Sequence, residues 1–448
     1  MLNKLAAITQ RLSPGLRQVL GNTSWLLADR IFQMGLALVV SIWVARYLKP
    51  QDYGLLTYAI TWVSMFGAIA DLGLGTIVVR EIAREPSAQN KNLTLGTAFV
   101  LRLIGGVVTV VITVFTISLV KPNEIVTRWL VGIVATGTIF QAFGTIDYWF
   151  QSQLQSKYIV VSRNFVAICT SALRLGLIYI QAAVIAFAWA KLAETALMGL
   201  ARVVSYRING NYLSSLRFSW TRAKSLLQES WPLILSGIAI YVYSKIDQVM
   251  LGSMLEDTTE LGFYSVAVKL SEIFDFIPII IAQSVLPKLA KVKSESNEIY
   301  YKYFQIYFDI MMLMWLVIAL PVSLLSPYII DTLYGQAYAA ATPILSLYVW
   351  AQFGTNFGMA RSNYLNVESK LQYSLYLSLS GAFINIALNF FLIPNFGAIG
   401  ATIATIITYF IVIIVLNFVL NDLRLVGVMI LRSLNLYKAY KRILGLVQ

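Results

Sequence analysis

Long runs of apolar residues recur along the whole chain, and they restrict the possible folds more than any other feature. Each run holds roughly 20 residues or more, and a helix of that length crosses the hydrocarbon core of a membrane. Hydrophobic residues make up 58% of the 448 residues and charged residues only 12%, whereas soluble proteins carry about 25% charged residues. The sequence therefore predicts an all-α polytopic membrane protein.

Reading the apolar runs in order predicts about twelve transmembrane helices in two sets of six. The first set lies at residues 23–47, 54–80, 92–120, 125–150, 158–181 and 183–205. The second set lies at residues 228–252, 261–286, 301–325, 337–361, 371–393 and 397–420. The expected organisation is a leader (1–22), an N-lobe (23–206), a basic interfacial linker (207–227), a C-lobe (228–420) and a basic tail (421–448).

A faint repeat relates the two sets of helices. The sequence YGLLTYA at 53–59 follows the first span, and LGFYSVA at 261–267 follows the seventh. Because each set has an even number of spans, the two repeats would run in parallel, as in transporters whose halves rock around a central cavity. We therefore expect two six-helix lobes around such a cavity.

The distribution of lysine and arginine tests the number of spans. Cytoplasmic loops of membrane proteins carry an excess of these residues. With twelve spans, the segments assigned outside hold only Arg46, Lys49, Lys121 and Arg128. Both termini are then cytoplasmic, and the N-terminal leader, which lacks a cleavage site, is retained. The net charge of +13 reflects topology and contact with anionic lipid headgroups, so no nucleic-acid partner is expected.

Several classes of chemistry lack the residues they need. The sequence contains no histidine and one cysteine, Cys169, which excludes imidazole-dependent catalysis, disulfides within the chain and thiolate metal clusters. It also has no phosphate-binding loop of the ATPase type and no large extramembrane loop. We expect no catalytic residues, no metal and no cofactor, and an enzyme is the weakest of the functional hypotheses.

The segment 46–84 holds a predicted turn and the second predicted span. Pro50, Asp52 and Gly54 predict a turn, since proline fixes φ, aspartate bonds its own backbone and glycine adopts strained conformations. The sequence DLGLG then interrupts the second span at residues 71–75. A carboxylate at membrane depth is costly, so Asp71 is expected to be functional or paired, and the glycines loosen the helix.

These motifs also carry a family resemblance. With LKPQDYG at 48–54, DLGLG at 71–75 and VVREIAR at 78–84, the chain resembles the polysaccharide transporter family. These are Wzx-type lipid-linked oligosaccharide flippases of the multidrug/oligosaccharidyl-lipid/polysaccharide exporter superfamily. The likeness in length and span pattern covers residues 23–420. It implies a flippase that moves a polyprenyl-diphosphate-linked oligosaccharide across the bacterial cytoplasmic membrane by alternating access.

Seven cations fall within the predicted spans, where each requires a structural or functional reason. Lys191 and Lys269 have a glutamate three residues further along and are expected to pair locally. The others are candidates for binding a diphosphate or an acidic sugar, because guanidinium groups bind phosphate oxygens bidentately. This substrate-binding set comprises Arg30, Arg102, Arg163, Arg174 and Lys245.

Polar residues also recur at helical spacing in several spans. Amides and hydroxyls of this kind either line a hydrated cavity, where they meet sugar hydroxyls, or hydrogen-bond between helices. The first alternative is favoured because the polar stripes are found in four or five spans together. The candidate cavity-lining amides are Gln141, Asn356, Asn385 and Asn389.

Carboxylates within the spans suggest a rival function. The related multidrug exporters use buried carboxylates to bind cationic drugs and to couple transport to protons or sodium. Asp29, Asp71 and Asp247 are therefore candidates for ion coupling. Equally, they can neutralise membrane-embedded arginines across helices, which is the preferred interpretation for Asp29 and Asp71.

The sequence therefore predicts a flippase for a lipid-linked oligosaccharide, used in cell-surface polysaccharide biosynthesis in the bacterial inner membrane. A polymerase or glycosyltransferases of the same pathway are the expected partners. One alternative is a cation-coupled multidrug exporter of the same superfamily. Another is a lipid II flippase, although that branch usually has two further spans for which the residues after Leu420 leave no room. A structural protein would have polar stripes that face each other without a cavity.

Overall fold

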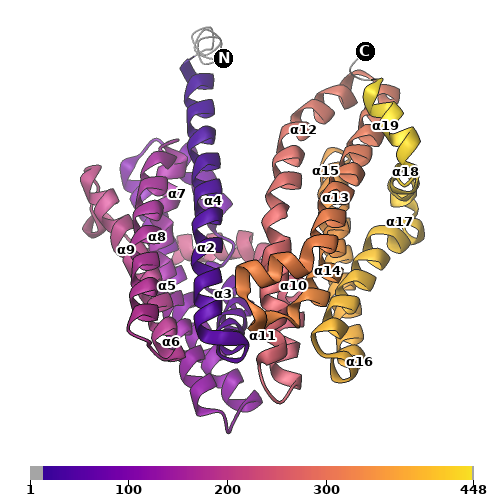
Figure 1. Cartoon of the computed structure of the whole chain (residues 1–448). Coiled ribbons are helices and arrows are strands. Elements are labelled where there is room, and N and C mark those ends of the chain that lie inside the picture. Colours follow the sequence, from indigo (N-terminus) through magenta and orange to yellow (C-terminus); the bar gives the residue numbers. More distant parts are fainter. Residues whose placement is uncertain (1–13, 446–448) are drawn as a thin grey trace, which may run out of the picture. The chain divides into compact units, whose positions relative to one another are not determined.

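The computed structural model describes residues 14–445, and within this range the regular structure is entirely helical. The described chain divides into two compact units. The first consists of Met1–Tyr47 and Ala59–Ile238, and the second of Leu48–Tyr58 and Ala239–Gln448. Residues 1–13 of the expected leader lie outside the described residues. Figure 1 shows the course of the helices.

The first unit is a bundle of mostly antiparallel helices. Long apolar helices pack side by side in it, with α5 against α6, α6 against α9, and α8 against α9 (Figure 1). Short connections of a few residues force neighbouring helices to run antiparallel. Its helices are α2 (Pro14–Met65) apart from Leu48–Tyr58, α3 (Gly67–Asp71), α4 (Gly75–Arg84), α5 (Ala88–Val120), α6 (Ile125–Phe140), α7 (Thr145–Ser152), α8 (Ser156–Tyr179), α9 (Val184–Ile208) and the first part of α10 (Trp220–Met254).

The second unit is built around α13, the long helix Asn297–Tyr334. Five helices pack directly against α13, namely α12, α14, α15, α18 and α19 (Figure 1). The other helices are α11 (Thr259–Glu272), α12 (Phe276–Glu295), α14 (Ala341–Tyr348), α15 (Gln352–Val367), α16 (Gln372–Phe410), a π-helical turn (Ile411–Val415), α17 (Leu416–Val419), α18 (Arg424–Ser433) and α19 (Leu436–Leu444).

Two of the longest helices each contain a sharp break. In α2 the break is Lys49 (φ 61°, ψ 171°), and in α16 it is Gly397 (φ 54°, ψ −133°). With these breaks counted, the long helical segments match the twelve spans expected from the sequence. Among the described residues, seven helices are long and apolar enough to cross a membrane, judged by length and composition alone. The bent helix pair Trp220–Val242 and Ser244–Met254 raises this number to eight if the pair forms one span.

The predicted turn at 50–54 is wrong in its details. Pro50 begins the second helical part of α2, and Gly54 lies inside it, so only Lys49 leaves the helical conformation. Proline is well suited to the first position of a helix, where its missing N–H has no partner to lose. It also disfavours the α-helical conformation in the residue before it, which agrees with a break at Lys49.

The second predicted span is interrupted where the sequence DLGLG occurs. Helix α3 ends at Asp71, and Leu72 and Gly73 follow with φ of 55° and 60° before α4 begins at Gly75. Glycine adopts this left-handed conformation without steric cost. The break therefore leaves Asp71 at the C-terminal end of α3.

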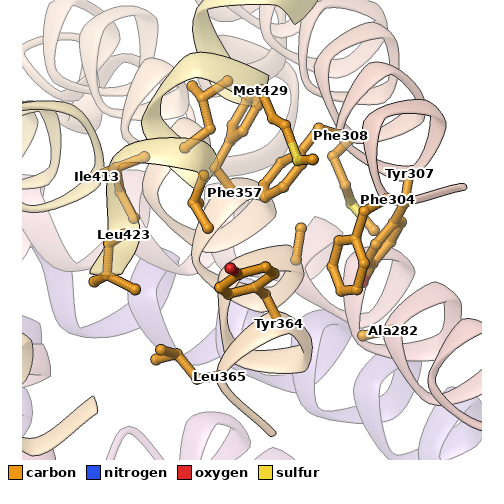
Figure 2. Close-up of a cluster of buried hydrophobic side chains, with 14 of the residues drawn as sticks. Ala282, Phe304, Tyr307, Phe308, Phe357, Tyr364, Leu365, Ile413, Leu423 and Met429 are labelled. Carbon is orange, nitrogen blue, oxygen red and sulfur yellow. The ribbon is translucent and has the colours of Figure 1, made fainter. Parts of the chain in front are cut away.

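Aromatic side chains form the core of the second unit. Phe304, Tyr307 and Phe308 of α13 face Phe357 of α15 and Met429 of α18 (Figure 2). The rings of Phe308 and Phe357 are stacked with centroids 6.1 Å apart. Since α18 contributes to this core, the first part of the C-terminal tail is an integral part of the unit. A separate cluster in the first unit joins α4, α5, α7 and α10.

Candidate functional site

Arg102 is the least exposed cation among the ion pairs in the described part of the first unit. Its Nη2 lies 2.8 Å from Oδ1 of Asp71, and its Nη1 donates to the Tyr148 hydroxyl over 2.8 Å. The Arg102 side chain is 7% exposed, whereas that of Asp71 is 51% exposed. Gly144 leaves room for the guanidinium, since a Cβ there would lie 2.9 Å from Nη1. The helix break at 72–73 thus presents a carboxylate at the surface of the unit with an arginine fixed behind it.

Arg163 pairs with Asp29 in the opposite arrangement. The Arg163 Nη1 lies 2.8 Å from Asp29 Oδ2, and here the arginine is the open partner, at 41% exposure against 1% for the aspartate. One turn along, Gln33 donates to Asn164 over 2.8 Å and fixes α2 against α8. Arg30 is exposed. The guanidinium of Arg163 is therefore oriented by a buried carboxylate and retains N–H groups that are open to a ligand.

Arg174 belongs to a cluster of three charges on α8 and α9. Glu194 accepts hydrogen bonds from Arg174 and, over 3.0 Å, from Lys191. All three side chains are partly exposed. The expected local pair of Lys191 and Glu194 is confirmed, and the cluster carries one positive charge in excess.

The second unit contains a more acidic group of residues. Lys245 of α10 pairs with Glu272 of α11 over 2.9 Å. Asp247, which is buried, accepts hydrogen bonds from the Tyr264 hydroxyl and the Gln248 amide, with the Thr405 hydroxyl 3.5 Å away. Glu272, which the sequence places one turn from Lys269, thus pairs with a lysine of another helix. Carboxylates outnumber cations in this group.

The four candidate cavity-lining amides differ in burial: three are buried asparagines and one is a partly exposed glutamine. Asn389 donates to Asn385 over 2.9 Å and Asn356 to the Gln352 carbonyl over 2.8 Å, and all three asparagines are buried. Gln141 lies at the start of a short 3₁₀ turn between α6 and α7 and is partly exposed. The asparagine side chains therefore bond along their own helices, and a role for these amides in lining a cavity stays a prediction.

Two further ion pairs join residues outside the predicted substrate-binding set. Arg202 makes a two-pronged contact with Asp147, with hydrogen bonds of 2.8–3.1 Å. Arg442 makes a similar contact with Asp309 over 2.6 and 2.8 Å. Both pairs join residues of different helices far apart in the chain. Asp147 and Asp309 each stand alone in an apolar run, which indicates that they need a partner but leaves the choice of partner open.

Long apolar helices with paired charges at membrane depth define a polytopic membrane transporter. The chain belongs to the polysaccharide biosynthesis protein family, which it matches over residues 19–293. It also matches the MatE family over residues 232–391. The resemblance carried by residues 48–84 is therefore confirmed.

Solved structures show the same fold. The chain is similar to the lipid II flippase MurJ in an inward closed conformation, with a TM-score of 0.72 and 15% identity over 93% of this chain and 95% of that one. For an inward-facing multidrug resistance MATE family transporter of the MOP superfamily, the TM-score is 0.69 and the identity 16%, over 91% and 96% of the two chains. The predicted all-α fold is thus confirmed, and it is the fold of these two proteins.

One curated relative shares a shorter stretch. A segment of 112 residues is 33% identical to an uncharacterized membrane protein of Methanocaldococcus jannaschii. The match covers 24% of this chain and 22% of the relative, so the chain spans about a fifth of that relative's length.

Proposed function

We propose that the protein flips a polyprenyl-diphosphate-linked oligosaccharide across the bacterial cytoplasmic membrane, for the biosynthesis of cell-surface polysaccharide. Both termini lie in the cytoplasm, and the two lobes alternate access to a central cavity through which the polar headgroup passes. Glycosyltransferases supply the substrate and a polymerase consumes it. Membership of the polysaccharide biosynthesis protein family supports the pathway.

The pair Arg163–Asp29 is the observation that carries the proposal. The buried Asp29 uses one N–H group of the guanidinium, and the exposed part of Arg163 retains further donors. A guanidinium group that is oriented before the ligand arrives binds a phosphate group at lower entropic cost. Four more cations lie in the same unit, namely Arg30, Arg102, Arg174 and Lys191. Together with Arg163 they make five positive charges, against the three carboxylates Asp29, Asp71 and Glu194. A diphosphate is the ligand that this charge balance favours.

A cation-coupled multidrug exporter is the second candidate. Asp247 and Glu272 of the second unit favour it, because carboxylates bind cationic drugs or coupling ions. We assign these carboxylates to charge pairing or ion coupling. A lipid II flippase requires the same diphosphate chemistry, and the 15% identity to MurJ speaks for a shared fold alone.

Binding to the purified protein tests the proposal. The melting temperature in detergent is measured with a polyprenyl-diphosphate oligosaccharide, with the corresponding monophosphate and with a cationic dye. We expect the diphosphate lipid to raise the melting temperature most. In the Arg174→Gln variant, the same rise should require about ten times more ligand. Glu194 remains paired with Lys191 in that variant, so its fold is preserved.

Arg84→Gln is the matched control, because Arg84 is an exposed arginine of α4 outside the substrate-binding set. This variant should bind like the unaltered protein. Stabilisation by the cationic dye alone, unchanged in Arg174→Gln, would contradict the proposal in favour of the drug exporter.

A further inference from the structure

The C-terminal helix α19 contacts the rest of the second unit through a narrow face. Ala439 is fully buried on this face, and Arg442 reaches from it to Asp309 of α13. The Nε and Nη2 atoms of Arg442 lie 2.6 and 2.8 Å from the two oxygens of that carboxylate, and Nη2 also donates to the Arg432 carbonyl over 3.1 Å. Asp309 is completely buried. The bidentate geometry fixes the orientation of α19 about its own axis.

The preceding helix α18 is attached firmly, so the start of α19 is fixed as well. Val426, Met429 and Ile430 of α18 are part of the aromatic core, and Figure 2 shows Met429 within it. Gln305 of α13 donates to the Met429 carbonyl over 3.0 Å and to the Ser433 hydroxyl over 3.2 Å. The tail therefore follows α13 closely (Figure 1).

The outward face of α19 combines aromatic, apolar and cationic side chains. At 100° per residue, Tyr437, Lys441 and Leu444 lie opposite Ala439. Tyr437 is 67% exposed, Tyr440 56% and Leu444 44%. The Lys441 ammonium lies 4.5 Å from the centre of the Tyr437 ring. The sequence from 423 to 448 contains basic residues but no acidic one.

We infer that the outward face of α19 binds the anionic headgroups of phospholipids, with Arg442 holding the helix at the level of the membrane surface. Asp309 lies near the start of the predicted span 301–325 and an uninterrupted apolar run follows it from Ile310, so the pair places α19 beside that end of the span. The last span ends at Val419, just before α18 begins. Tyrosine and lysine on one face of a short amphipathic helix are typical of interfacial helices.

A protein partner fits this face less well. A stable protein interface covers about 800 Å² on each partner, whereas α19 has nine residues, of which one face is free. The uniformly basic sequence matches a surface of distributed negative charge. The inference does not depend on the proposed transport function.

A fluorescence experiment on the full chain tests the inference. In a Cys169→Ser background, which removes the one cysteine, Tyr440→Cys is labelled with an environment-sensitive dye. The protein is placed in nanodiscs of phosphatidylcholine alone or mixed with phosphatidylglycerol, both with a headgroup spin-labelled lipid as quencher. We expect quenching to increase when phosphatidylglycerol is present.

Charge-reversal variants show which residues cause the increase. Lys438→Glu and Lys441→Glu should each reduce the phosphatidylglycerol-dependent increase in quenching by about fivefold. Lys288→Glu and Lys291→Glu, in the exposed part of α12, are the matched controls and should leave the quenching of the label unchanged. A label that stays unquenched in both nanodiscs, or one quenched equally in both, would overturn the inference. This experiment measures lipid contact of α19 and not transport. A negative result would therefore overturn the inference about α19 and leave the proposed transport function untouched.

Discussion

Gly54 and Gly262 cross so closely that neither position has room for a side chain. A Cβ on Gly54 would lie 2.8 Å from the amide nitrogen of Gly262, and a Cβ on Gly262 would lie 2.0 Å from the Pro50 carbonyl oxygen. Beside this crossing, the Thr258 hydroxyl donates to the Gln51 carbonyl over 2.7 Å. Both glycines lie in the second unit, and they occupy equivalent positions of the faint repeat. The crossing therefore joins the two repeats through equivalent residues.

Alanine at either glycine should destabilise the protein. The new methyl group meets backbone atoms that cannot rotate away, so the two helices must separate, at a cost of about 1–3 kcal/mol. We expect Gly54→Ala and Gly262→Ala to lower the melting temperature in detergent. Gly35→Ala is the control, since nothing lies within 4 Å of a Cβ at Gly35; the account is wrong if all three variants melt alike.

Asp71 and Arg102 should behave as a coupled pair. Asp71→Asn removes the charged partner of a buried guanidinium, and we expect a loss of about 1–3 kcal/mol in stability. The double variant Asp71→Asn/Arg102→Gln has no unpaired charge and should recover part of this loss. The melting temperatures of the two single variants and the double variant measure the coupling. Strictly additive losses would show that the pair contributes nothing.

The pair Arg442–Asp309 should matter most for stability. Arg442→Gln leaves a fully buried carboxylate without its cation, and breaking a buried pair in this way costs about 3–5 kcal/mol. Asp309→Asn/Arg442→Gln should be markedly more stable than Arg442→Gln alone. Lys441→Gln, which changes the neighbouring exposed lysine, is the control for thermal unfolding. If Arg442→Gln unfolds at the same temperature as this control, the pair does not hold α19.

The contact between Glu81 and Arg222 should depend on pH. The hydrogen bond from the Arg222 guanidinium over 2.7 Å holds the pKa of Glu81 below its ordinary value. Because the folded-state pKa is the lower one, this stabilisation is fully present above the unfolded pKa of about 4.3 and is lost as the pH falls through the folded value.

We therefore expect Arg222→Gln to lower the melting temperature at pH 7, and this difference should shrink as the pH falls below the unfolded pKa of about 4.3. The difference at pH 7 corresponds to less than about 1 kcal/mol, since both side chains are about 30% exposed. Lys224→Gln, two residues away, controls for loss of a positive charge. A difference between Arg222→Gln and the unaltered protein that persists unchanged at pH 3.5 would contradict the assignment.

Sequence alone predicted the helices well because hydrophobic runs and breakers act locally. The break at Gly397 falls where the eleventh and twelfth spans were separated, and DLGLG interrupts the second span as its glycines indicate. The helical start at Pro50 was misread because the same proline suits a turn and the first position of a helix. Such local ambiguities are settled by the packing of 48–58 on α11, which sequence patterns do not contain.

The charged site was only partly predictable for the same reason. Lys191 and Glu194 lie one turn apart, so their pairing follows from helical spacing. Arg163 and Asp29 are 134 residues apart, and Arg442 and Asp309 are 133 apart. Those contacts depend on which helices pack together and at what height. The sequence identified the charges that need partners, and the structure identifies the partners.

Translocation in proteoliposomes is the most direct test of the central claim. The rate of movement of a fluorescent polyprenyl-diphosphate oligosaccharide is compared for the unaltered protein, Arg84→Gln, Arg163→Gln and Asp29→Asn/Arg163→Gln. The double variant removes the buried carboxylate along with its partner, so it separates loss of binding from loss of folding. We expect the first two proteins to move the lipid and both Arg163 variants to be about tenfold slower. Export of cationic dyes without movement of the lipid-linked saccharide, unaffected by either Arg163 variant, would contradict the account.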